Sequence, residues 1–88
     1  MKPYAALLAE LLSKELFAFR SRNALTQEAM AERLHISSRA YSDLERGKSC
    51  ASAVTLMFLL PMLDAEAQHT LFHQFLACAQ NLEGDDAA

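Results

Sequence analysis

Hydrophobic residues recur at three- and four-residue spacing along the chain, the pattern of amphipathic helices. The first predicted helix runs from about Pro3 to Arg22, with Glu10 and Lys14 on its polar side. Proline suits the first turn of a helix because its missing N–H is not needed there. The predicted core side of this helix consists of Tyr4, Leu8, Leu11, Leu12, Leu16 and Phe19.

Residues 26–47 predict two short helices joined by a tight turn. Thr26 is expected to cap the first of them, and Met30 and Leu34 fall on its buried face. His35 stands where the chain must leave that helix. This position is often left-handed and usually glycine, although histidine is among the residues that tolerate a positive φ.

The second helix of the pair, residues 37–45, has distinct hydrophobic and polar sides. Ser37 is expected to cap it, and Gly47 follows its last turn. Tyr41 and Leu44 point inward at helical spacing. The outward residues are Ser38, Arg39, Ser42 and Asp43.

Two further helices complete the predicted secondary structure. Ser52 caps a helix that is apolar almost all round, which indicates burial on more than one side, and Pro61 must kink or end it. Asp64 caps a fifth helix, whose hydrophobic arc is wider than a surface helix requires. The 88 residues fit a single domain over residues 1–83, followed by a disordered tail at 84–88.

The motif carries the residues Leu25-Thr26-Gln27-Glu28, Ala31, Ser37 and Leu44-Glu45-Arg46-Gly47. In this spacing, residues 16–60 resemble the Cro and phage-repressor type of helix-turn-helix protein, the XRE family. The resemblance implies an all-α, five-helix, lambda-repressor-like fold, here with an extended first helix and an amphipathic C-terminal helix. It also implies a structural ion pair between Arg20 and Glu45. His35 and Tyr41 depart from the family pattern, which has a turn glycine and a smaller aliphatic residue there.

The resemblance implies a transcriptional regulator that binds double-stranded DNA, with helix 37–45 in the major groove. Arg39 is the strongest candidate for base reading, because its planar guanidinium can bind O6 and N7 of guanine together. Asp43 can only accept from cytosine or repel a phosphate. For each candidate DNA-binding residue, the alternative interpretation is an ordinary surface residue. The predicted DNA-binding residues are Gln27, Ser37, Ser38, Arg39, Ser42, Asp43, Arg46 and Lys48.

The net charge of −3 is unfavourable for a DNA-binding protein, because contacts to phosphate supply most non-specific affinity. The charge is unevenly distributed, however. Residues 20–48 contain six basic and four acidic side chains, a balance of +2, while the remainder carries −5. The charge therefore leaves a second reading open, in which the helix-turn-helix fold binds a protein, as an antitoxin-like or anti-repressor module, with weak or no DNA binding.

The last two helices and the first carry more hydrophobic residues than a chain of this size can easily bury alone. We therefore expect a homodimer with a two-fold symmetric contact. The predicted interface residues are Phe58, Leu71, Phe72, Phe75 and Leu76.

Catalytic, metal and cofactor sites are not expected. His69 and His73 lie four apart but lack a third ligand, so a solvated helix face is the favoured interpretation. Cys50 and Cys78 have no metal-type spacing and predict reduced thiols. The chain shows no secretory signal, membrane-spanning segment or evident small-molecule site, and we expect a soluble, cytoplasmic protein.

Overall fold

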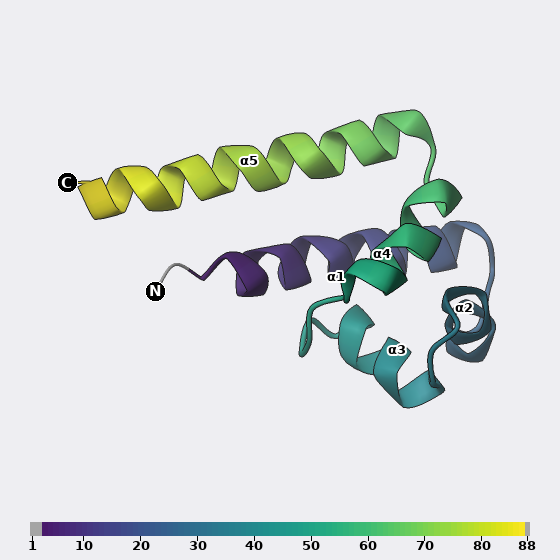
Figure 1. The fold of residues 1–88 in the computed structure, drawn as a ribbon. Coiled ribbons are helices and arrows are strands. Elements are labelled where there is room, and N and C mark those ends of the chain that lie inside the picture. The colour runs from purple at the N-terminus through teal and green to yellow at the C-terminus, as the bar shows by residue number, and fades with distance from the viewer. Residues whose placement is uncertain (1–2, 88) are drawn as a thin grey trace.

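The computed structural model describes residues 3–87, with side chains up to residue 84, and this span is all-α (Figure 1). The prediction of an all-α fold with five helices is confirmed. A single 3₁₀ turn joins the last two helices. The elements are α1 (Tyr4–Arg22), α2 (Gln27–Leu34), α3 (Ser38–Glu45), α4 (Ala53–Leu59), the 3₁₀ turn (Leu60–Met62) and α5 (Ala65–Ala87).

Short polar side chains begin four of the helices. Each accepts a hydrogen bond of 2.7 to 3.2 Å from the backbone N–H three residues later, a donor that the first helical turn leaves free. Because capping depends only on neighbouring residues, the sequence located these helix starts correctly. The capping residues are Thr26 of α2, Ser37 of α3, Ser52 of α4 and Asp64 of α5.

Residues with positive φ end the first three helices: Ala24 at 52°, His35 at 60° and Gly47 at 74°. In each case the N–H of the following residue bonds to the carbonyl oxygen five positions earlier, with N···O distances of 2.8 to 3.0 Å. This is the Schellman arrangement, which satisfies a carbonyl group at the helix end. His35 therefore does adopt the left-handed conformation expected of it, and Ala24 does the same without glycine's freedom.

The hydrophobic core lies between α1, α2, α3 and α4 and receives one fully buried leucine from α5. Tyr41 is completely buried, and Leu71 is only 2% exposed. The assignment of Leu71 to a dimer interface is therefore wrong, because its side chain already packs inside the monomer. The core residues are Leu12, Leu16, Phe19, Met30, Ala31, Leu34, Tyr41, Leu44, Leu59, Leu63 and Leu71.

Helix α5 lies alongside α1 and runs in the opposite direction, so both chain ends lie on one side of the molecule (Figure 1). The Tyr4 hydroxyl of α1 donates to Glu83 Oε1 of α5 at 2.8 Å. At the other end of α5, the Gln68 amide donates to two carbonyl oxygens of the preceding segment. The helix continues to Ala87, where a disordered tail over 84–88 was predicted; residue 88 lies outside the described residues.

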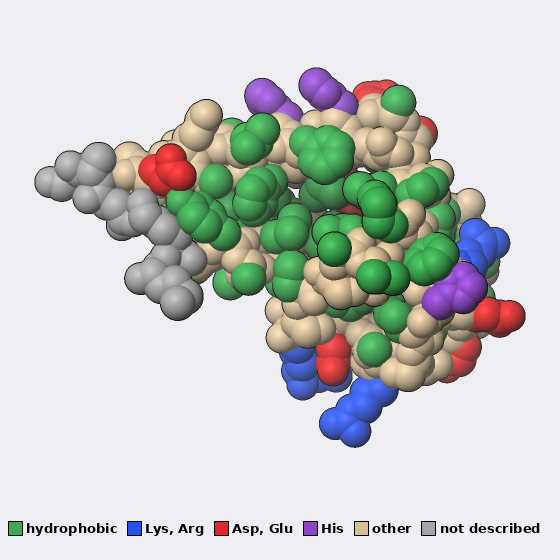
Figure 2. Space-filling model, in the orientation of Figure 1, with side chains coloured by type: hydrophobic (Ala, Val, Ile, Leu, Met, Phe, Trp, Pro, Cys, Tyr) green, Lys and Arg blue, Asp and Glu red, His purple; other side chains and the backbone are tan. Residues whose placement is uncertain are grey.

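Hydrophobic side chains gather over α4 and α5 on one face of the molecule (Figure 2). Only Thr55 and Leu59 of α4 are buried, so the expectation that this helix is buried on more than one side is wrong for the single chain. Exposed apolar groups of this size are typical of interaction sites. The α4/α5 apolar surface comprises Val54 (68% exposed), Met57 (66%), Phe58 (43%), Phe72 (51%) and Leu76 (58%).

Candidate nucleic-acid interface

Helices α2 and α3 pack on each other and lie on the opposite side of α1 from α5 (Figure 1). α3 also contacts α1, so two helices support it from behind. The inward side chains of α3, Tyr41 and Leu44, are buried at 0% and 6% exposure. α3 is therefore a short rod whose inner side is fixed by the core.

The outer side of α3 is not covered by any described part of the chain at its first turn. Ser37, Ser38 and Arg39 are exposed there, while Ser42 and Asp43, one turn later, are half-buried. The Ser37 hydroxyl accepts from the N–H of Ala40 as the helix cap, so one of its lone pairs is already used. The predicted base-reading residues thus lie on one helix face, and Arg39, the basic residue among them, is exposed.

Basic side chains lie at both ends of α3, with Arg39 in its first turn and Arg46 and Lys48 just after its last residue. Arg39, Arg46 and Lys48 are exposed, and none of them forms an ion pair with the residues that the structure describes. Lysine and arginine side chains reach beyond the lower edge of the molecule in Figure 2, on the side that α3 occupies in Figure 1, with an acidic side chain beside them. Unpaired cations are free to contact phosphate oxygens.

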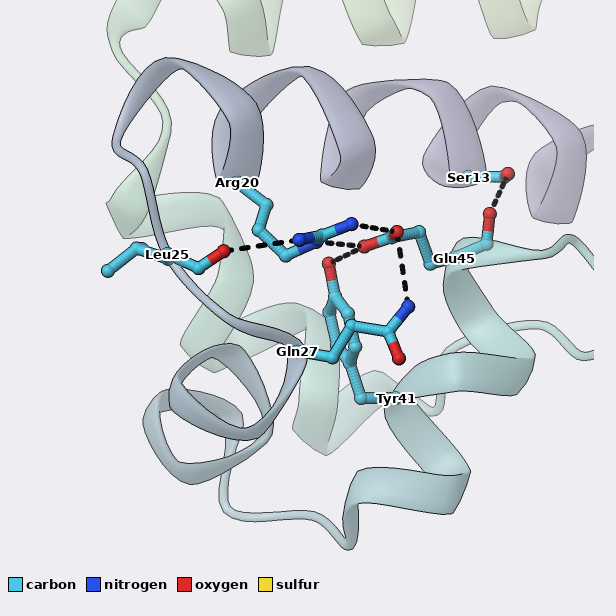
Figure 3. A network of polar contacts seen from close by, with 6 residues as sticks. All are labelled: Ser13, Arg20, Leu25, Gln27, Tyr41 and Glu45. Atoms are coloured by element: carbon cyan, nitrogen blue, oxygen red, sulfur yellow. Dashed lines mark hydrogen bonds and ion pairs between the residues drawn. The ribbon is translucent and has the colours of Figure 1, made fainter.

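The carboxylate of Glu45, the last residue of α3, is the centre of a polar network (Figure 3). Arg20 Nε and Nη2 each donate to one of its oxygens at 2.8 Å, so the ion pair expected from the family resemblance is present in bidentate form. Arg20 Nη1 also donates to the carbonyl oxygen of Leu25 at 3.2 Å. The guanidinium lies 5.7 Å from the centre of the Phe17 ring. Arg20 thereby ties the end of α1 to the end of α3.

Three further residues join this network that sequence reasoning did not place there. Gln27 Nε2 donates to Glu45 Oε1 at 3.3 Å, and the Tyr41 hydroxyl donates to Glu45 Oε2 at 2.5 Å. The Ser13 hydroxyl donates to the main-chain carbonyl oxygen of Glu45. Tyr41 and Glu45 are four apart on one helix, a spacing that brings side chains together, and this signal was available in the sequence. The contacts of Ser13 and Gln27 depend on how the helices cross.

The network shifts the ionisation of its members. Hydrogen bonds from Arg20, with help from Tyr41 and Gln27, hold the pKa of the Glu45 carboxyl below its ordinary value against the opposing effect of burial. The same pair raises the pKa of Arg20. Burial, followed by the nearby carboxylate, raises the pKa of the Tyr41 hydroxyl. At neutral pH the carboxylate is therefore charged and the phenol remains a hydrogen-bond donor.

A sequence profile of the helix-turn-helix family matches residues 16–60, just over half of the chain. The chain belongs to the Cro and phage-repressor type of helix-turn-helix family. Comparison with curated proteins and with solved structures returned no match. Membership of this family implies DNA binding, and the family is typically non-enzymatic.

In this helix-turn-helix protein, the residues predicted for the dimer interface are unequally exposed. Phe58, Phe72 and Leu76 belong to the α4/α5 apolar surface, and Phe75 is half-buried beside it. The Phe58 ring also contacts the His35 ring, with centroids 4.5 Å apart, which connects the turn of the motif to α4. The surface available to a partner is therefore made by α4 and one side of α5.

The remaining sequence candidates show no site geometry. The rings of His69 and His73 lie parallel on α5, 6.3 Å apart, and the described residues contain no cluster of three or more His, Cys, Asp or Glu suited to a metal ion. Cys50 and Cys78 are both free and half-buried. Within the described span, no helix combines the length and apolar character needed to cross a membrane.

Proposed function

We propose that this helix-turn-helix protein is a sequence-specific transcriptional regulator that places α3 in the major groove of DNA as a homodimer. The observation that carries the proposal is the arrangement of α3. Its inner residues are locked in the core, whereas Arg39 on its first turn is exposed and forms no ion pair with any described residue. A rigid helix with a free guanidinium at its leading end suits the reading of base edges.

The proposed contacts divide into two kinds. Arg39 reads guanine, with Ser38, Ser42 and Asp43 completing the base-facing side. The remaining residues hold the sugar-phosphate backbone, where the free N–H groups at the start of α2 add to the attraction for phosphate. The proposed backbone contacts are Gln27, Ser37, Arg46 and Lys48.

The homodimer is proposed from the α4/α5 apolar surface, which is distinct from the base-reading side of α3. Five large apolar side chains are each between 43% and 68% exposed, and exposing this much apolar surface to water is unfavourable in free energy for a chain of this size. A second copy would cover the same residues of both chains by two-fold symmetry. The operator would then be roughly palindromic, with half-sites about 34 Å apart or a multiple of that distance.

The salt dependence of DNA affinity tests this proposal. Fluorescence anisotropy with a generic duplex is measured over a series of salt concentrations. Contacts to phosphate predict that affinity falls steeply and linearly on a double logarithmic plot, with a slope of about −0.9 for each phosphate neutralised. Absence of binding at low salt would contradict the proposal.

A second candidate is a helix-turn-helix fold that binds a protein partner. The observations that favour it are the net charge of −3 and the acidic Asp43 on the outer side of α3. A module that binds only protein would show no salt-dependent binding to the generic duplex. The same anisotropy series therefore distinguishes the two functions.

A further inference from the structure

We infer that the Tyr41 hydroxyl is a positioning residue for DNA backbone contact, because it fixes the Glu45 carboxylate that in turn orients the amide of Gln27. This inference rests on the proposed DNA binding, and it assigns a role to a group on the buried side of α3. Tyr41 touches no surface that DNA can reach, since its side chain is completely buried. Its effect must pass through another residue.

Glu45 provides that route. Its carboxylate accepts four hydrogen bonds: two from Arg20, one from Tyr41 and one from Gln27. An ionised carboxylate offers about four lone-pair sites, so its accepting capacity is filled. Each oxygen has two donors. Oε1 is shared by Arg20 Nη2 and Gln27 Nε2, and Oε2 is shared by Arg20 Nε and the Tyr41 hydroxyl.

The weakest link of this set is the one that holds Gln27. Its Nε2 lies 3.3 Å from Glu45 Oε1, whereas the other three bonds are between 2.5 and 2.8 Å. Loss of the Tyr41 hydroxyl leaves Oε2 with a single donor, and the carboxylate is then free to rotate toward the guanidinium. The contact with Gln27, being the longest, is the first to be lost.

The orientation of the Gln27 amide matters for phosphate binding because Gln27 is the first residue of α2, where free backbone N–H groups attract phosphate. The amide nitrogen carries two N–H donors. One is used by Glu45, and the bond fixes which way the amide points (Figure 3). The second N–H is left for a phosphate oxygen. A carboxylate that keeps its place therefore presents this donor ready-made, without an ordering cost on binding.

The test compares Tyr41→Phe with Ser13→Ala. Both remove one hydroxyl that donates to Glu45, but Ser13 reaches the main-chain carbonyl and not the carboxylate. DNA affinity is measured well below the melting temperature of the less stable variant. Tyr41→Phe is expected to weaken binding about 3- to 10-fold, equally for preferred and random duplexes, and Ser13→Ala to leave affinity unchanged. In a Gln27→Ala background, Tyr41→Phe is expected to have no further effect.

A measurement without DNA separates this inference from the proposed function. In the NMR spectrum of the free protein, Tyr41→Phe is expected to shift the side-chain N–H signals of Gln27, and Ser13→Ala to leave them in place. If Tyr41→Phe leaves the Gln27 signals unshifted, the role of Tyr41 is overturned while DNA binding stays intact. The same follows if Tyr41→Phe lowers DNA affinity equally in the wild-type and Gln27→Ala backgrounds. If Tyr41→Phe shifts the Gln27 signals but the wild-type protein binds no DNA, the proposed function is removed instead, and with it the phosphate contact inferred for Gln27.

Discussion

Arg20 near the end of α1 and Glu45 at the end of α3 form a two-pronged ion pair, with both nitrogen-to-oxygen distances at 2.8 Å. The side chains are only 22% and 8% exposed. The pair thus holds α3 against α1 at a point where solvent screens the charges poorly. α3 presents its outer residues from a fixed base because its last residue is anchored in this way.

Replacing Glu45 with Gln is therefore expected to lower the free energy of unfolding substantially. The variant keeps the shape of the side chain but leaves the Arg20 charge without its partner, which costs about 3 kcal/mol in a buried pair. Urea denaturation followed by circular dichroism measures the change.

Lys14→Ala provides the control for this substitution. Lys14 pairs with Glu10 at 3.8 Å on the surface of α1, where the two side chains are 74% and 69% exposed. Its removal is expected to change stability by less than about 0.5 kcal/mol. Equal effects of the two substitutions would show that the Arg20–Glu45 pair is no more than a surface contact.

The same carboxylate predicts how stability depends on pH. The pKa of Glu45 is lower in the folded chain than in the unfolded chain, so its contribution is fully present above the unfolded value of about 4.3. The contribution is lost as the pH falls through the folded pKa. The stability difference between wild type and Glu45→Gln should therefore be constant from neutral pH to about pH 5 and then shrink on further acidification. A difference that grows in acid would contradict this assignment.

The residues with positive φ that end the helices predict two substitutions with opposite effects on stability. Ala24 is exposed and has a φ of 52°, so Ala24→Gly relieves backbone strain without loss of packing and should stabilise the fold by about 0.5 to 1 kcal/mol. Gly47→Ala introduces the same strain at a φ of 74° and should destabilise it by about 1 kcal/mol. A Cβ at Gly47 would lie 3.8 Å from Ser13 Cβ, an ordinary contact, so a clash is not the cause. Thermal unfolding of both variants checks the signs.

The proposed dimer predicts that a charge on the α4/α5 apolar surface separates the subunits. Leu76→Lys should give a folded monomer, because Leu76 is already 58% exposed in the single chain. Gln74→Lys adds the same charge to an exposed position on another side of α5 and should leave the dimer intact. Size-exclusion chromatography with light scattering measures both masses. A monomeric wild-type protein at high concentration would contradict the dimer.

The sequence was most informative where structure depends on neighbouring residues. Thr26, Ser37, Ser52 and Asp64 were each predicted as helix caps, and each accepts the expected backbone bond, because capping is decided within one helical turn. The Arg20–Glu45 pair, 25 residues apart, came from the family resemblance and not from the spacing itself.

Contacts that depend on how helices cross were not predictable in the same way. The Ser13 hydroxyl meets the carbonyl of Glu45 only because α1 passes the end of α3, and the bond between Tyr4 and Glu83 spans 79 residues. Leu71 was placed on the dimer surface because the broad hydrophobic arc of α5 does not reveal which part faces α1. The structure assigns Leu71 to the core and leaves Phe72 exposed.

Selection of bound duplexes from a random pool, followed by sequencing, tests most directly whether α3 reads DNA. The wild-type protein and Arg39→Ala are compared under identical salt conditions. The wild type is expected to enrich a roughly palindromic sequence with a conserved guanine in each half-site, and Arg39→Ala to lose that guanine preference with little change in melting temperature. Failure of the wild type to enrich any sequence, or enrichment of the same guanine by Arg39→Ala, would contradict base reading by Arg39 on this helix.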